Sequence, residues 1–217
     1  MSFFAGLGGL GFVLVAIAVN VIYVRARLPL PIAGQGLEVV TDAYAAVGDG
    51  LRRPSVLGPL LWLCTTVFAA GLLSALWQNG GLGPWALVGF AGVLMQNATF
   101  ACIEALRFGM AAAATHDRGS MAGLQGFSNV LFGFNQVFLA IALLGFTAAG
   151  TGLIPWWHTG LGYASAALLF VSSSASPYNA GGTHRIAVVG LVGWLGWIVW
   201  IVVYSTTLLT TGATWGS

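Results

Sequence analysis

The sequence contains no lysine, and charged residues of either sign make up only 6% of its 217 residues. Globular domains carry roughly 25% charged residues, which keep their surfaces soluble in water. The net charge of +2 is too small to indicate a nucleic-acid partner. Because hydrophobic residues make up 58% of the chain, the composition predicts an integral membrane protein.

Cysteine and histidine are also scarce. Cys64 and Cys102 both lie in apolar runs, where a thiol behaves as a small hydrophobic group, so we predict no disulfide bond. The three histidines, His116, His158 and His184, lack the spacing of metal ligands. We therefore predict neither a metal nor another cofactor, and we expect His158 to be a hydrogen-bond donor at the outer membrane boundary.

Long apolar stretches dominate the rest of the chain. A membrane-spanning helix needs about 20 predominantly apolar residues. Six stretches approach or exceed this length: 3–24, 55–77, 85–114, 122–148, 158–175 and 186–209. The fifth is the weakest, because it is short and ends in serines. The predicted fold is all-α, a polytopic transmembrane bundle of six spanning helices in which residues 1–217 form a single domain.

The arginines outside these stretches predict the orientation of the bundle. They occur only in the first, third and fifth connections, at Arg25, Arg27, Arg52, Arg53, Arg118 and Arg185. Because positively charged loops stay on the cytoplasmic side, both termini are expected on the outer face. The predicted location is the plasma (inner) membrane of the cell, with multiple passes.

The first connection, residues 25–54, is the only long one. Leu37, Val40, Tyr44 and Val47 recur within it at near-helical spacing. This pattern is typical of a short amphipathic helix on the cytoplasmic interface. A solvated loop with a few apolar contacts explains the same residues, and the sequence leaves both interpretations open.

Two charged residues, Glu104 and Arg107, lie inside the third stretch. A charge at membrane depth costs a few kcal/mol even on lenient scales, so we predict that they form an ion pair within the bundle. Asn97 lies on the same helix face as Glu104. A helix that continues to Ala114 places Glu104 near mid-depth, whereas one ending near Arg107 makes the pair interfacial. The apolar sequence after Arg107 favours the deeper position.

The fourth stretch carries a polar stripe at helical spacing, formed by Gln125, Asn129, Phe132 and Gln136, with Asn135 at its border. Amides in hydrocarbon need partners, so the stripe is expected to face the bundle and to bond the polar groups of the third stretch. One interpretation is that these groups only hold helices together. The other is that they line a polar cavity.

The sixth stretch adds an aromatic stripe, Trp197, Trp200 and Tyr204. Such stripes usually pack or contact lipid, but beside a polar cavity they would suit an unsaturated ligand or a carbocation. The 32 glycines of the chain allow helices to approach closely. They favour a compact bundle, with homo- or hetero-oligomers through glycine-rich helix faces as a further possibility.

The run F-N-Q-V-F-L-A-I-A-L-L-G-F-T-A-A-G-T-G-L-I-P-W-W-H-T-G-L-G-Y-A-S-A-A-L-L-F resembles uncharacterised six-helix membrane proteins of actinobacteria and other bacteria. The resemblance covers residues 95 to 205 and implies no function. The chain is also similar, more distantly, to small integral-membrane terpene cyclases, whose helices carry asparagine and acidic residues around an aromatic cavity. Their Trp-Glu pair is absent here, because Ile103 precedes Glu104.

These features lead to three hypotheses of function. The preferred one is a membrane enzyme that acts on a lipophilic, isoprenoid-like small molecule, with Glu104 as the general acid of a cyclisation or isomerisation. The alternatives are a non-enzymatic accessory or structural subunit and, with less support, a small-molecule transporter. The expected partners are membrane lipids and the lipophilic small molecule.

Overall fold

The computed structural model describes residues 2–28, 35–78 and 83–211. These residues are almost entirely helical, and no β-strand occurs among them. The helices are α1 (Ser2–Arg25), α2 (Leu37–Val47), η1 (Gly48–Leu51), α3 (Arg52–Ser55), α4 (Leu57–Gln78), α5 (Gly83–His116), η2 (Arg118–Ser120), α6 (Met121–Gly150), α7 (Trp156–Ser174), η3 (Ser176–Asn179) and α8 (Ile186–Thr211). The all-α prediction is therefore confirmed.

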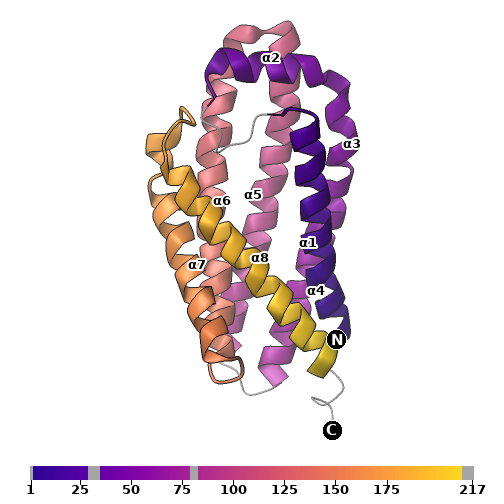
Figure 1. Ribbon diagram of the computed structural model, residues 1–217, viewed down its shortest axis with the longest axis vertical. Coiled ribbons are helices and arrows are strands. Elements are labelled where there is room, and N and C mark those ends of the chain that lie inside the picture. Colours follow the sequence, from indigo (N-terminus) through magenta and orange to yellow (C-terminus); the bar gives the residue numbers. More distant parts are fainter. Residues whose placement is uncertain (1, 29–34, 79–82, 212–217) are drawn as a thin grey trace.

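Helices α1, α4, α5, α6, α7 and α8 run along the bundle in alternating directions, so that the start of α1 and the end of α8 lie at the same end (Figure 1). Each agrees within two residues with a stretch expected from the sequence. Five of the described helices are long and apolar enough to cross a membrane. The exception among the six is the serine-rich α7, which has 19 residues.

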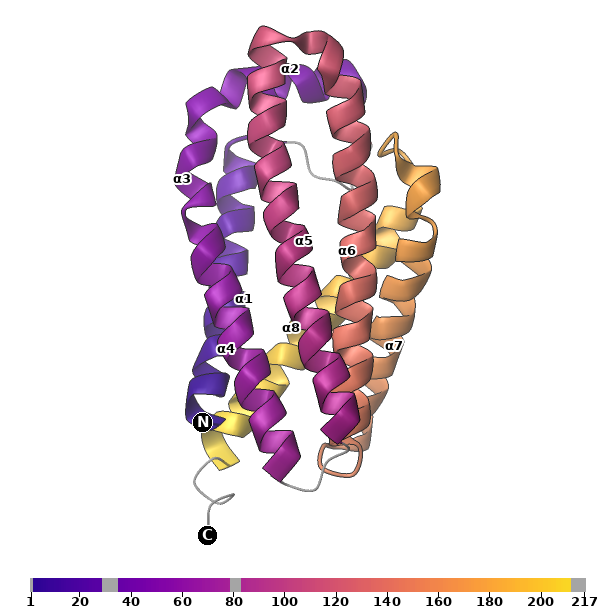
Figure 2. The same ribbon diagram turned by 180° about the vertical axis from the view of Figure 1, so that it is seen from behind.

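Close helix contacts depend on glycine. The long helices α5 and α6 pack side by side over much of their length, and Gly145 of α6 lies directly against the backbone of Gly89 on α5. A side chain at either position would collide with the other helix. The other helices pack in a ring, α1 on α4 and α8, and α7 on α6 and α8. Helix α8 crosses the bundle obliquely, from the end of α7 to the start of α1 (Figures 1 and 2).

The first connection contains the expected helix, α2, which lies across one end of the bundle against α5 (Figures 1 and 2). Val40, Thr41 and Tyr44 are its buried residues. An exposed ion pair, Arg118 Nη2 to Asp42 Oδ1 at 2.5 Å, links α2 to the turn between α5 and α6. The helical interpretation is therefore confirmed, and α2 caps the bundle as part of its packing.

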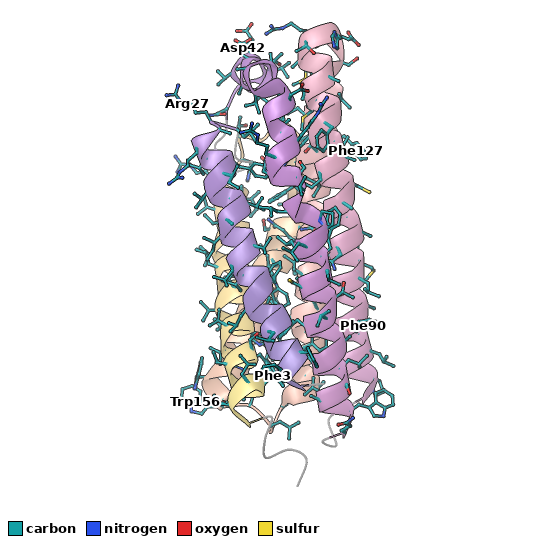
Figure 3. All side chains as sticks on the ribbon, turned by 90° about the vertical axis from the view of Figure 1, so that its right-hand side faces the viewer. Phe3, Arg27, Asp42, Phe90, Phe127 and Trp156 are labelled. Atoms are coloured by element: carbon teal, nitrogen blue, oxygen red, sulfur yellow. The ribbon has the colours of Figure 1, made fainter. Side chains whose placement is uncertain are left out.

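The two ends of the bundle differ in composition. Arg27 and Asp42 lie at the end covered by α2, and Phe3 and Trp156 lie at the opposite end (Figure 3). At that opposite end, the helix termini carry exposed tryptophans at Trp77, Trp85, Trp156 and Trp157. Indole rings prefer the headgroup level of a membrane. The position of the site can therefore be described relative to the tryptophan-rich end and the charged end of the bundle.

Candidate functional site

The charged residues of α5 form a compact triad with α1. Arg107 Nη1 donates to Glu104 Oε1, and the Tyr23 hydroxyl donates to Glu104 Oε2 at 2.8 Å. The Arg107 guanidinium also lies over the Tyr23 ring, 4.5 Å from its centroid, which is a cation–π contact. The predicted ion pair is therefore confirmed. The prediction that amides of α6 bond to this pair is wrong for the described residues, because the hydroxyl of Tyr23 on α1 bonds to Glu104 instead.

The triad lies near the end of the bundle that α2 covers, and the depth of Glu104 in a membrane stays a prediction. Glu104 follows the exposed Trp85 by 19 residues, or about 29 Å of helix, which is nearly the whole hydrocarbon thickness of about 30 Å. Its partner Tyr23 precedes Arg25, the last residue of α1, by two residues. Helix α5 continues past Ala114, and its 34 residues extend about 51 Å, which is longer than a hydrocarbon core of about 30 Å.

A cavity of about 280 Å³ begins at this triad and extends into the bundle. Its walls are mostly apolar, with polar groups contributed by several helices. The lining residues used below are Ala16, Asn20, Tyr23, Val24, Tyr44, Arg107, Asn129, Phe132, Asn135, Gln136, Ser172, Ala187, Gly190 and Trp197. An apolar pocket with a few convergent polar groups is the usual form of a small-molecule site.

Three buried residues of the lining carry a polar atom with no hydrogen-bond partner: Asn135 Oδ1, Gln136 Oε1 and Trp197 Nε1. The exposed fractions of these residues are 4%, 8% and 1%. A buried polar atom without a partner costs about 1–3 kcal/mol, and such atoms are uncommon in folded proteins. Each of the three atoms has almost no accessible surface, so it is turned away from the open space although its residue lines the cavity.

The structure separates the predicted site residues into two groups. Six of them line the cavity: Arg107, Asn129, Phe132, Asn135, Gln136 and Trp197. The other five do not belong to its lining: Asn97, Glu104, Gln125, Trp200 and Tyr204. Tyr23 and Tyr44 were missed by the sequence analysis as site residues, because nothing in their local sequence shows that α1 and α2 converge on Arg107.

Asn97 holds α5 to α4 and has no contact with the cavity. Its Nδ2 donates to Thr66 Oγ1 at 3.1 Å and to the Trp62 carbonyl at 3.3 Å, and its Oδ1 accepts from Thr65 Oγ1 at 3.0 Å. This is the helix-linking role that polar residues commonly have in membranes. The packing interpretation is therefore correct for this residue.

Asn129 both lines the cavity and links two parts of the chain. It lines the cavity, and its Nδ2 donates to the Ala180 carbonyl at 2.9 Å. That bond holds the segment between α7 and α8 against α6, beside Gly182, which has a positive φ of 75°. Gln125 lies one helical turn earlier, with an unpartnered Oε1 outside the cavity.

Trp200 and Tyr204 surround a buried histidine instead of the charged triad. The His158 ring is stacked on Trp200 with a centroid distance of 5.3 Å and lies 5.2 Å from Tyr204. His158 Nε2 is 3.1 Å from the Trp200 carbonyl, and the residue is only 1% exposed. His158 therefore donates a hydrogen bond, as expected, but it does so inside the bundle, while the neighbouring Trp156 is exposed.

The cavity reaches the bundle surface between α1 and α8. Asn20 and Val24 of α1 are lining residues with exposed side chains, and Ala187 of α8 is half-buried. The two helices lie close together near the chain termini and diverge toward the charged end (Figure 1). Among the described residues, these exposed lining side chains indicate that the cavity is accessible from the side of the bundle.

Tyr44 contributes the one lining side chain of α2. Burial raises the pKa of Tyr44 above its ordinary value, although the nearby positive charge of Arg107 acts in the opposite direction. The phenol is therefore neutral at physiological pH and keeps a hydrogen to donate at the triad end of the cavity.

Comparisons of the chain with protein-family models, with curated proteins and with solved structures found no match. Across the described residues, no group of three or more His, Cys, Asp or Glu side chains is placed to hold a metal ion. The geometry of the cavity is therefore the basis for assigning a function.

Proposed function

We propose that this protein is a multi-pass membrane protein that binds a lipophilic small molecule in the cavity between α1, α5, α6 and α8. In this proposal all six long helices cross the plasma membrane and both termini lie outside. The arginine-bearing connections then lie in the cytoplasm, and the exposed tryptophans Trp77, Trp85 and Trp156 lie at the outer headgroups.

The observation that carries the proposal is the cavity of about 280 Å³, which has polar side chains in a mostly apolar wall. Arg107, Asn129, Asn135 and Gln136 line it. Packed interiors contain few voids larger than a water molecule, and an apolar space of this size with a few polar groups is the usual form of a small-molecule site.

The position of the opening supports a ligand that arrives from the bilayer. The mouth between α1 and α8 is flanked by exposed apolar residues such as Val24, which is 56% exposed. A molecule dissolved in the inner leaflet would enter sideways, with its polar part directed toward Arg107 and the amides of α6. Water-soluble ligands have no comparable reason to use a lateral opening in hydrocarbon.

Acid-initiated cyclisation or isomerisation, with Glu104 as the general acid, stays a prediction. Both Glu104 oxygens accept hydrogen bonds, one from Arg107 and one from Tyr23, and Glu104 is outside the cavity lining. A general acid needs a direct or single-water path to the atom it protonates. Binding is therefore the function that this geometry supports best.

The oligomer proposed from the glycine-rich faces also stays a prediction. Gly6 and Gly9 of α1 lie against α8, and Gly193 of α8 lies against α7. These glycines are used for contacts within one chain, so an accessory role would need a different surface.

The test fills the cavity with an added side chain. Ala187→Phe places a ring at the mouth, whereas Ala105→Phe adds the same ring on the exposed side of α5. Native mass spectrometry of protein purified in mild detergent should show a retained lipophilic molecule in the wild type and Ala105→Phe, and its loss in Ala187→Phe. Equal occupancy in all three proteins, at equal thermal stability, would contradict the proposal.

A further inference from the structure

We propose that the cavity holds the uncharged, hydroxyl-bearing head group of a lipid, whose hydrocarbon tail leaves the bundle between α1 and α8. This inference rests on the proposed function and specifies the chemical class of its ligand. It follows from the charge, the hydrogen-bonding groups and the size of the cavity.

The charge of the cavity favours a neutral head group. Arg107 is the only charged side chain among the described lining residues, and its ion pair with Glu104 leaves no net charge at that end. An anionic head group would compete with Glu104 for the guanidinium. A cationic head group would meet Arg107 before it reached Glu104, which lies behind the lining.

The amides of the lining match a hydroxyl. Asn135 and Gln136 line the cavity, and a side-chain amide carries N–H donors and a carbonyl acceptor. A hydroxyl group both donates and accepts hydrogen bonds, so it can bond to either end of an amide.

The packing around Gln136 keeps its amide beside the cavity. The backbone of Gly190 on α8 lies against both the Gln136 amide and the Ser172 hydroxyl. Ser172 Oγ in turn donates to the Ile186 carbonyl at 3.2 Å. A side chain at position 190 would displace these groups, so glycine leaves room for a polar corner formed by α6, α7 and α8.

The size of the cavity limits it to part of a lipid. Its volume of about 280 Å³ lies just below the range of roughly 300–1,000 Å³ for small-molecule pockets. A head group and the first part of a chain fit such a volume, and the remaining chain must extend through the lateral opening. Exposed Val24 and half-buried Ala187 lie along that path.

A matched series of lipids with one chain and three head groups tests the inference. Oleyl alcohol, oleate and oleylamine share an 18-carbon chain and differ only in head-group charge. Delipidated protein in detergent is titrated with each compound, and the rise in unfolding temperature reports binding to the folded state. We expect oleyl alcohol to stabilise the protein at a concentration at least tenfold lower than that needed for oleate or oleylamine.

Variants of the amides provide the second arm. Gln136→Met and Asn135→Leu remove one hydrogen-bonding group each, so the apparent affinity for oleyl alcohol should fall about two- to tenfold. The ligand-free variants should melt at or above the wild-type temperature, because each unpartnered oxygen is lost. Gln78→Met, at an exposed position on α4, should change neither property.

The outcomes separate this inference from the proposed function. Equal stabilisation by the three lipids, preference for a charged head group, or unchanged affinity in both amide variants would overturn the head-group assignment. Binding to the cavity could still be correct in those cases, provided that Ala187→Phe abolishes the stabilisation. If Ala187→Phe also has no effect on binding, the proposed function fails as well.

Discussion

Glu104→Gln is the substitution with the largest expected effect on stability. The Glu104 and Arg107 side chains are only 9% and 13% exposed. Replacing the carboxylate with an amide leaves the guanidinium without a counter-charge inside the bundle. Removing one partner of a buried pair typically costs about 3–5 kcal/mol, which is a large fraction of a total stability of about 5–15 kcal/mol.

The chain provides a matched control for this substitution. Asp42 pairs with Arg118, but these side chains are 70% and 58% exposed, and surface pairs contribute about 0–1 kcal/mol. Asp42→Asn should therefore cost less than about 1 kcal/mol. The measurement is the free energy of unfolding of each variant in detergent micelles, by denaturant titration of the same preparation.

A double variant tests whether the uncompensated charge is the cause. Glu104→Leu combined with Arg107→Met removes both charges, and replacing a buried pair with apolar residues is often neutral. The double variant should recover most of the stability that Glu104→Gln loses. Equal, small losses for Glu104→Gln and Asp42→Asn would refute the reasoning, because they would show that Glu104 is solvated.

Three further predictions concern packing and topology. Asn97→Leu removes hydrogen bonds between α4 and α5 and should lower the free energy of unfolding by about 1–3 kcal/mol, as denaturant titration would show. Gly145→Ala should destabilise the protein by about 1–3 kcal/mol, because the added methyl group meets the backbone of α5. Gly123→Ala lies in open space on the same helix and should stabilise the protein by about 0.5–1 kcal/mol. A thermal melt that ranks the two variants in the opposite order would contradict the packing. Single cysteines at Asp49 and Thr151 should react with an impermeant thiol reagent from opposite sides of the membrane, and labelling from one side would contradict the topology.

Hydropathy was sufficient to predict the long helices. Their bounds differ from the expected ones by two residues or fewer, because apolar composition and helical structure change together at the ends of such segments. The amphipathic spacing in residues 37–47 likewise identified α2. The count of six spans stays a prediction, since α7 is helical but less apolar than the other five.

The candidate site could be predicted only in part. The spacing of Glu104 and Arg107 was enough to predict their pairing, because both lie on one helix. The role of Tyr23 depends on how α1 packs against α5, which helical periodicity does not encode. The apolar sequence after Arg107 correctly indicated that α5 continues past Ala114, whereas the depth of the pair in a membrane stays a prediction.

The aromatic stripe shows the same limit. Trp197, Trp200 and Tyr204 share one face of α8, yet Trp197 reaches the cavity while Trp200 and Tyr204 pack around His158. Because α8 runs obliquely across the bundle (Figure 1), residues at different positions along one face of this helix contact different neighbouring helices. A periodic pattern on a single helix gives no information about that crossing.

Photo-crosslinking tests the central claim, a lipid-binding cavity between α1 and α8, most directly. A long-chain alcohol with a diazirine near its hydroxyl group is added to the protein in bilayer nanodiscs, and the labelled residues are mapped by mass spectrometry. The label is predicted to fall on lining residues of α6 and α8, near Gln136 and Gly190, and to disappear in Ala187→Phe. Label confined to outward-facing residues such as Phe127 (Figure 3), and unchanged in Ala187→Phe, would contradict the claim.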